Sequence, residues 1–79
     1  MYPDEAVERG IGGYVEIEFD IGKNGETENL RIISYEPDSV FNEQALSAIA
    51  KWRYMPKMVD GQPVTVYGVT ERINFVFKI

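Results

Sequence analysis

The chain has 79 residues, a formal net charge of −5, and neither cysteine nor histidine. With 44% hydrophobic residues, these totals indicate one small globular domain, residues 1–79. They exclude disulfide scaffolds, thiolate zinc sites and Ser–His or Cys–His catalysis. Scattered basic residues on an acidic chain also argue against nucleic-acid binding, whose affinity comes from clustered Lys and Arg. No apolar run approaches the roughly 18 residues that a membrane span needs.

The first predicted element is a short helix that begins near Pro3 and ends at Gly10. A helix of two turns is stable only when it packs on something. Its apolar side chains are Tyr2 and Val7, so we expect these two to dock on the rest of the domain.

Residues 13–21 alternate more regularly than any other segment, which predicts a half-buried strand. The side chains expected to face the core are Val15, Ile17, Phe19 and Ile21. The side chains expected to face water are Tyr14, Glu16, Glu18 and Asp20. The dipeptide Asn24-Gly25 follows, and it predicts a type I′ hairpin turn in which both residues have positive φ.

The return strand is predicted over residues 26–34. Its inward side chains are Leu30 and Ile32, and its outward ones are Thr27, Asn29 and Arg31. Pro37 ends this strand because it cannot donate to a ladder.

A helix is predicted from about Val40 to Arg53, capped by Asp38 or Ser39 and stopped by Pro56. Its apolar stripe consists of Phe41, Ala45, Ala48, Ile49 and Trp52, widened by Leu46. With Phe19, the residues Phe41, Ile49 and Trp52 are the expected core. Tyr54 lies beyond the stripe; we assign it to the core, with a partner contact as the alternative.

Asp60-Gly61 marks a second turn, and Gly68 predicts a bulge or bend before the last strand. That strand, residues 69–79, alternates again. One face carries Val69, Ile73, Phe75, Phe77 and Ile79, and the other carries Thr70, Arg72, Asn74 and Lys78, with Val76 as the one apolar exception. The sequence therefore predicts an α+β domain of two layers: a three-stranded antiparallel sheet with one long helix on one face and a short N-terminal helix. The last strand pairs beside one strand of the hairpin. If it pairs beside the first, it lies at an edge of the sheet.

The segments that suggest catalysis or ligand binding have simpler structural readings. Residues 10–13 are glycine-rich but precede a strand, whereas a phosphate loop precedes a helix. Residues 20–31 lack the Glu that a calcium loop needs at its twelfth position, which is Arg31 here. Glu16 and Glu18 share a strand face and are expected to be solvated. We expect no enzyme activity, no metal and no cofactor.

An ordered set of residues along the chain resembles the C-terminal periplasmic domain of TonB-type energy transducers. Its most specific part is Trp52-Arg53-Tyr54 followed by Pro56. The set also contains Tyr2-Pro3, Ala6, Gly10-Ile11, Gly13, Val15-Glu16-Ile17, Phe19, Gly25, Ser34, Pro37, Phe41, Ala45, Gly61-Gln62-Pro63-Val64, Ile73-Asn74-Phe75 and Phe77. The resemblance covers nearly the whole chain.

The resemblance implies a domain in the periplasm, joined by a Pro-rich linker to an inner-membrane helix that works with ExbB and ExbD. It implies binding of outer-membrane receptors for iron chelates and cobalamin, whose TonB box adds as a strand to the last strand of the domain. The residues expected to bind this partner are Tyr2, Pro3, Thr70, Glu71, Arg72, Ile73, Asn74, Phe75, Val76, Phe77 and Lys78. Of these, Phe75 and Phe77 are expected to pack inward.

The chain departs from the family pattern at both ends. Members often carry Gln and Pro ahead of the Tyr-Pro pair, whereas only Met1 precedes Tyr2 here. No strand follows Ile79, so we expect the edge of the last strand to be free to recruit a partner. That edge also suits a homodimer. The membrane helix and linker that the resemblance implies are absent from this chain, so we expect a domain cut from a longer protein. The alternatives are a TolA-like or secretion-adaptor scaffold with another protein partner, and a small enzyme or metal-dependent domain.

Overall fold

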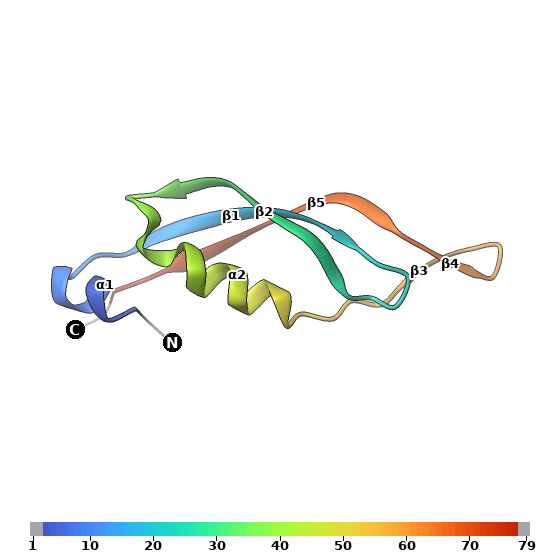
Figure 1. The fold of residues 1–79 in the computed structure, drawn as a ribbon, viewed down its shortest axis with the longest axis horizontal. Coiled ribbons are helices and arrows are strands. Elements are labelled where there is room, and N and C mark those ends of the chain that lie inside the picture. The colour runs from blue at the N-terminus through green and yellow to red at the C-terminus, as the bar shows by residue number, and fades with distance from the viewer. Residues whose placement is uncertain (1–2, 78–79) are drawn as a thin grey trace.

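Three strands form one antiparallel sheet in the computed structural model, which describes residues 3–77. Their order is β2-β1-β5, with β1 at Gly13–Ile21, β2 at Thr27–Glu36 and β5 at Val66–Phe75. The helical layer consists of α1 at Asp4–Arg9, a 3₁₀ turn at Ser39–Phe41 and α2 at Asn42–Ala50 (Figure 1). The predicted α+β architecture is confirmed, and the last strand pairs with the first, at an edge.

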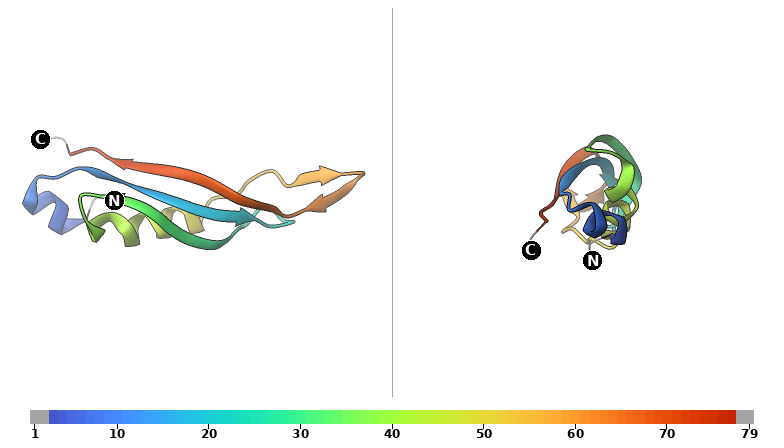
Figure 2. Two further views of the ribbon diagram at one scale, coloured as in Figure 1. Left: turned by 90° about the horizontal axis from the view of Figure 1, so that it is seen from above. Right: turned by 90° about the vertical axis from the view of Figure 1, so that its left-hand side faces the viewer.

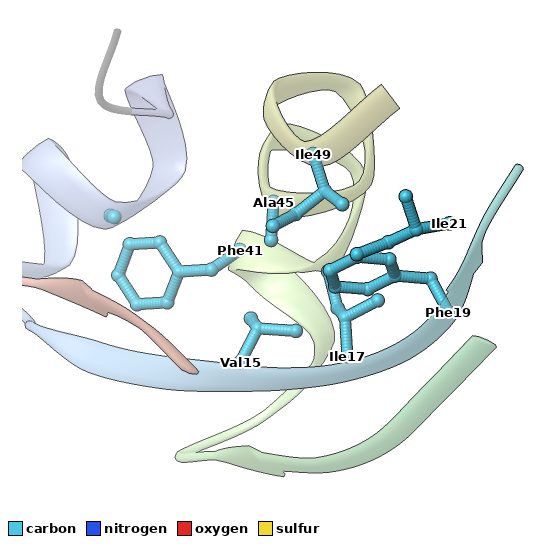
Figure 3. Packing of buried hydrophobic residues seen from close by; sticks show 8 residues of the cluster. Val15, Ile17, Phe19, Ile21, Phe41, Ala45 and Ile49 are labelled. Carbon is cyan, nitrogen blue, oxygen red and sulfur yellow. The ribbon is translucent and has the colours of Figure 1, made fainter. Parts of the chain in front are cut away.

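The core lies between β1 and α2. Figure 3 shows the alternate side chains of β1 directed toward the helix, which presents every fourth residue to them. The buried apolar residues are Ala6, Val15, Ile17, Phe19, Ile21, Phe41, Ala45 and Ile49. Fully burying one large apolar side chain contributes roughly 1.5–3 kcal/mol. This cluster is therefore the main source of stability for a sheet of only three strands.

The long helix is shorter than predicted. It ends at Ala50, so Trp52 lies in the segment that follows it and is half-buried against the core. The cause is backbone pairing, since Arg53 forms a bridge with Glu26 and Tyr54 N–H donates to the Gly25 carbonyl at 2.9 Å. A backbone paired with the hairpin cannot continue a helix.

The buried face of α2 also differs from the predicted stripe. Ala48 is exposed and Asn42, which was not predicted to face the core, is half-buried; Leu46 is half-buried and packs against the core, as predicted. Asn42 and Leu46 lie on one side of the line formed by Phe41, Ala45 and Ile49, and Ala48 lies on the other. The buried face is therefore displaced toward Asn42 and Leu46.

The short helix occurs at the predicted place but packs through a different residue. Ala6 is buried, and the Val7 side chain is 52% exposed. Helix α1 contacts the 3₁₀ turn before α2, and the small Ala6 side chain permits that close approach. Tyr2 lies outside the described residues.

The first hairpin turns at the predicted position but with another geometry. Gly25 N–H donates to the Gly22 carbonyl at 2.9 Å, and Gly22 N–H donates to the Glu26 carbonyl at 2.8 Å. This is a three-residue loop in which only Gly25, with φ 82°, is left-handed. A side chain at Gly25 would also collide with the Tyr54 carbonyl oxygen.

Two residues predicted to face water are bound inside the fold. Asp20 is 5% exposed and accepts hydrogen bonds from Asn29 Nδ2 at 2.9 Å and Gly68 N–H at 3.1 Å. Thr27 Oγ1 donates to the Ile49 carbonyl at 2.9 Å. Both result from shifts in register, which alternation alone does not reveal. The shift beside Asp20 is the predicted bulge, with Gly68 at φ 71°.

A second hairpin, at the place where the sequence predicts a turn, extends from one end of the molecule (Figure 2). It consists of β3 at Lys57–Val59 and β4 at Gln62–Val64, joined by Asp60 and Gly61, both with positive φ. The domain measures 51 × 19 × 15 Å. The three-stranded sheet and this hairpin both run along its long axis (Figure 2).

Candidate functional site

The outer edge of β5 is a regular and unpaired strand edge. Seven consecutive residues pair with β1 without interruption, from Val69 opposite Phe19 to Phe75 opposite Gly13. Within residues 3–77, no strand pairs with the other side of β5. Unpaired N–H and C=O groups along a regular edge are a template for a further strand.

The direction of the free backbone groups follows from Phe75. A side chain at Gly12 would collide with the Phe75 carbonyl oxygen, so this carbonyl points toward the β1 side of the strand. Successive residues of an antiparallel strand direct their N–H and C=O groups to opposite sides. Thr70, Arg72 and Asn74 therefore direct their backbone groups to the free edge.

The opposite edge of the sheet, on β2, is less suited to receiving a strand. Its pairing with β1 contains two register shifts, and Asn29 has a left-handed φ of 53°. Exposed Glu28 and Glu36 stand along it. Bulges and charges of this kind protect an edge from pairing.

On the outer face of the sheet, Arg72 lies across the first strand. Its guanidinium carbon is 4.1 Å from the centroid of the Tyr14 ring, and its Nη2 is 3.6 Å from Glu16 Oε2. The Arg72 side chain is 49% exposed. Neither contact is a short hydrogen bond, so the cation keeps donors available to solvent or to another group.

Arg31 occupies the equivalent position on the β2 side of the same face. It contacts Glu18 at 3.2 Å and Asp20 at 3.6 Å. The hydrogen bond from Asn29, the N–H of Gly68 and the Arg31 charge together lower the pKa of Asp20, against the opposing effect of burial. The acid-rich face is therefore a network of ion pairs across three strands.

The inner face of β5 completes the core and carries one charge. Phe75 stacks on Phe41, with ring centroids 4.3 Å apart. Glu71, half-buried on this face, lies beside the Tyr54 hydroxyl. The pKa of Tyr54 is raised mainly by burial. The negative charge of Glu71 and its hydrogen bond with the hydroxyl raise it further. The Tyr54 ring also lies 5.9 Å from Phe19.

The predicted partner-binding residues separate into groups. Thr70, Arg72 and Asn74 are exposed on the outer face, whereas Glu71, Ile73 and Phe75 are half-buried on the inner face. Just beyond β5, Val76 is exposed and Phe77 is half-buried. Lys78 and Tyr2 lie outside the described residues.

Pro3 is not brought to this edge. It is half-buried and lines a shallow groove with the α2 residues Glu43, Gln44 and Ser47. Tyr14 and Glu16 were not predicted as site residues. Their outward positions were visible in the sequence, but their place opposite Asn74 and Arg72 depends on the register.

Within the described part of the chain, no three His, Cys, Asp or Glu side chains gather in a way that would hold a metal ion. None of the helices there combines the length and apolar character needed to cross a membrane.

A family model for the Gram-negative bacterial TonB protein C-terminal matches residues 1–78. The chain is 38% identical over 74 residues to the TonB protein of Klebsiella pneumoniae, covering 94% of this chain and 28% of that protein. It is 33% identical over all 79 residues to the TonB protein of Escherichia coli K12, 30% of which is covered. The chain thus spans less than a third of the length of these curated relatives.

Solved structures agree in fold. The solution NMR structure of the Pseudomonas aeruginosa TonB CTD superimposes with a TM-score of 0.82 at 29% identity, covering all of this chain and 79% of that one. The TonB2 protein from Vibrio anguillarum gives a TM-score of 0.75 at 30% identity, with 100% and 74% covered. The chain belongs to the family of Gram-negative bacterial TonB C-terminal domains.

Proposed function

We propose that this domain is the receptor-binding end of an energy transducer, and that it binds by adding a strand of the receptor to the outer edge of β5. The observation that supports this most directly is the regular edge itself, with the backbone groups of Thr70, Arg72 and Asn74 directed outward. The partner is an outer-membrane receptor for iron chelates, cobalamin or similar nutrients. Its TonB box supplies the added strand.

In the complete protein, the domain would lie in the periplasm, joined to an inner-membrane anchor that works with ExbB and ExbD. Family membership supports this arrangement, and the chemistry of the domain agrees with a binding role. A strand addition needs backbone hydrogen bonds, each worth about 1 kcal/mol net. Six or seven such bonds give a reversible link of modest affinity.

The experiment is an NMR titration of the labelled domain with a synthetic receptor segment that contains a TonB box. We expect the largest shifts at the amides of residues 70–76. Asn74→Pro should abolish binding, because it replaces an N–H that faces the free edge with a ring that blocks the approach of the added strand. The pairing with β1 uses the backbone groups of the neighbouring residues and should stay intact. Asn74→Ala is the matched control, since it keeps the N–H, and it should bind like the original domain.

Shifts confined to α1 and the groove beside Pro3 would contradict the proposal, as would full binding by Asn74→Pro. A homodimer through the same edge would use the same groups. It would appear as a dependence of the β5 amide shifts on protein concentration, and the peptide should compete with it. Binding of Tol-system partners at β5 in place of the receptor segment would favour the TolA-like alternative.

A further inference from the structure

The strand that β5 receives should have a defined charge pattern, because the two faces of β5 carry opposite charges at adjacent positions. Arg72 is the only charged side chain on the outer face of the described part of β5, between Thr70 and Asn74. Glu71 lies on the inner face, beside the Tyr54 hydroxyl. A strand added to this edge would place its side chains beside both.

We infer that Arg72 selects a carboxylate on the outer face of the added strand, and that Glu71 disfavours one on the inner face. This inference rests on the proposed strand addition. The partner it describes is an extended segment with one acidic residue between two apolar ones. The acid faces Arg72, and the apolar neighbours cover the inner face near Ile73.

The distances favour this attraction over repulsion by the nearby acids. Neighbouring strands are about 4.8 Å apart, so a carboxylate on the added strand would be one spacing from the backbone of Arg72. The guanidinium, which lies over Tyr14 in the free domain, would turn toward the free edge to meet it. The carboxylate would be two spacings, about 10 Å, from Glu16 on β1. At physiological ionic strength the Debye length is about 8 Å. The contact with Arg72 therefore outweighs the more distant carboxylate.

The state of Arg72 in the free domain agrees with this role. Tyr14 supports the guanidinium from one side at 4.1 Å, and Glu16 contacts it at 3.6 Å, beyond hydrogen-bond length. The side chain is thus held over the sheet while half of it stays exposed. Because the Glu16 contact is longer than a hydrogen bond, the Arg72 side chain can leave it and turn toward a carboxylate on the added strand.

The inner face supplies the complementary restraint. Glu71 is flanked by Val69 and Ile73, which are half-buried and packed against the core. An apolar side chain on the added strand would cover them, whereas an acid there would lie beside Glu71. A slip of one residue exchanges the two faces of a strand. Arg72 and Glu71 together would therefore fix both which face of the segment is turned outward and its register.

The test uses three peptides with the sequence Val-Thr-Val-X-Val-Thr-Val, where X is Glu, Gln or Lys, each titrated into the labelled domain. We expect affinity to fall in the order Glu, Gln, Lys, with about a threefold difference per step, the size of an exposed ion pair. The order should flatten when the salt concentration rises from 0.1 M to 1 M, where the Debye length falls to about 3 Å.

Arg72→Gln should remove the preference, and Arg72→Lys should keep most of it. Lys23→Gln is the matched control, because it removes one positive charge from the exposed hairpin turn, seven residues along the chain from Glu16, which lies opposite Arg72. It should leave the order unchanged. Unchanged β1 amide shifts away from Tyr14 and Glu16, which Arg72 contacts, would show that the sheet is intact in the free Arg72→Gln domain.

Three results would overturn the inference. If the peptides shift the β5 amides but Arg72→Gln keeps the order, strand addition stands and charge selection by Arg72 fails. If Lys23→Gln loses the order as well, the effect belongs to the net charge and not to Arg72. If no peptide shifts the β5 amides while the TonB-box segment does, strand addition stands and the inference fails; if the TonB-box segment is also silent, the proposed function fails with it.

Discussion

The backbone N–H of Gly68 donates to the carboxylate of Asp20 at 3.1 Å and fixes the bulge at which β5 bends onto β1. A buried carboxylate that accepts from a bulge and from Asn29 on the neighbouring strand connects all three strands at one point.

We expect Asp20→Asn to destabilise the domain more than Glu18→Gln, the matched loss of a carboxylate on the same strand. An Asn side chain has one acceptor oxygen, so its NH₂ group would face a donor, either Gly68 N–H or the Asn29 amide. Urea denaturation would give the free energies of unfolding. Hydrogen exchange should be faster at Gly68 in Asp20→Asn only. Equal stability of the two variants would contradict this role for Asp20.

Acid should weaken the fold through two carboxylates. The hydrogen bond from Asn29 is the largest cause that lowers the pKa of Asp20, and the hydrogen bond from Val40 N–H, with Arg9, lowers the pKa of Asp38. A folded-state pKa below the unfolded value of about 3.9 means that the unfolded chain binds protons first as pH falls. Their stabilisation is therefore complete above the unfolded pKa and is lost as pH falls through the folded one.

Denaturation measured from pH 7 to pH 2 should show this loss below about pH 4. The double variant Asp20→Asn, Asp38→Asn should start less stable and lose less on acidification. An equally steep loss in the double variant would assign the acid sensitivity to other carboxylates.

Alanine substitutions at Gly25 and Gly61 would separate the destabilisation caused by backbone strain from that caused by steric collision. Both glycines have left-handed φ, 82° and 78°, but a Cβ at Gly25 would strike the Tyr54 carbonyl, whereas a Cβ at Gly61 meets nothing within 4 Å. Gly61→Ala should therefore cost about 1–2 kcal/mol, the price of left-handed backbone alone. Gly25→Ala should cost clearly more and disturb the amides of Tyr54 and Glu26. Similar costs at the two positions would show that the collision is relieved by movement of the 53–54 segment.

Glu71→Gln should lower the pKa of Tyr54 but leave it above the ordinary value of about 10. Burial is the largest cause of the raised pKa and remains in the variant, whereas the charge and the hydrogen-bonding carboxylate of Glu71 are removed. An NMR titration of the Tyr54 ring would measure the change. A pKa that does not move would place the Glu71 carboxylate away from the hydroxyl in solution.

The structure agrees with the sequence prediction where a local pattern determines it. Alternation in residues 13–21 predicted the four core side chains of β1, and Gly68 predicted a bulge. The end of α2 was missed because Tyr54 gives up its helical hydrogen bond for one to Gly25, which is distant in sequence.

The candidate site was predictable as an edge but not as a set of contacts. Period-2 alternation and the position of the strand pointed to β5. The stacking of Arg72 on Tyr14, and the burial of Asp20, depend on cross-strand register and on bulges. A single sequence does not specify these, because shifting one strand by a residue leaves its own alternation unchanged.

The three strands run along the 51 Å axis of the domain, and this orientation has a mechanical consequence. Tension applied along that axis to a strand on the β5 edge would act parallel to the strands. All the inter-strand hydrogen bonds would then bear the load together in shear. A pull across the axis would instead open them one at a time, like a zipper, at much lower force. The shape of the domain therefore favours a link that is strong along one direction and easily released along another.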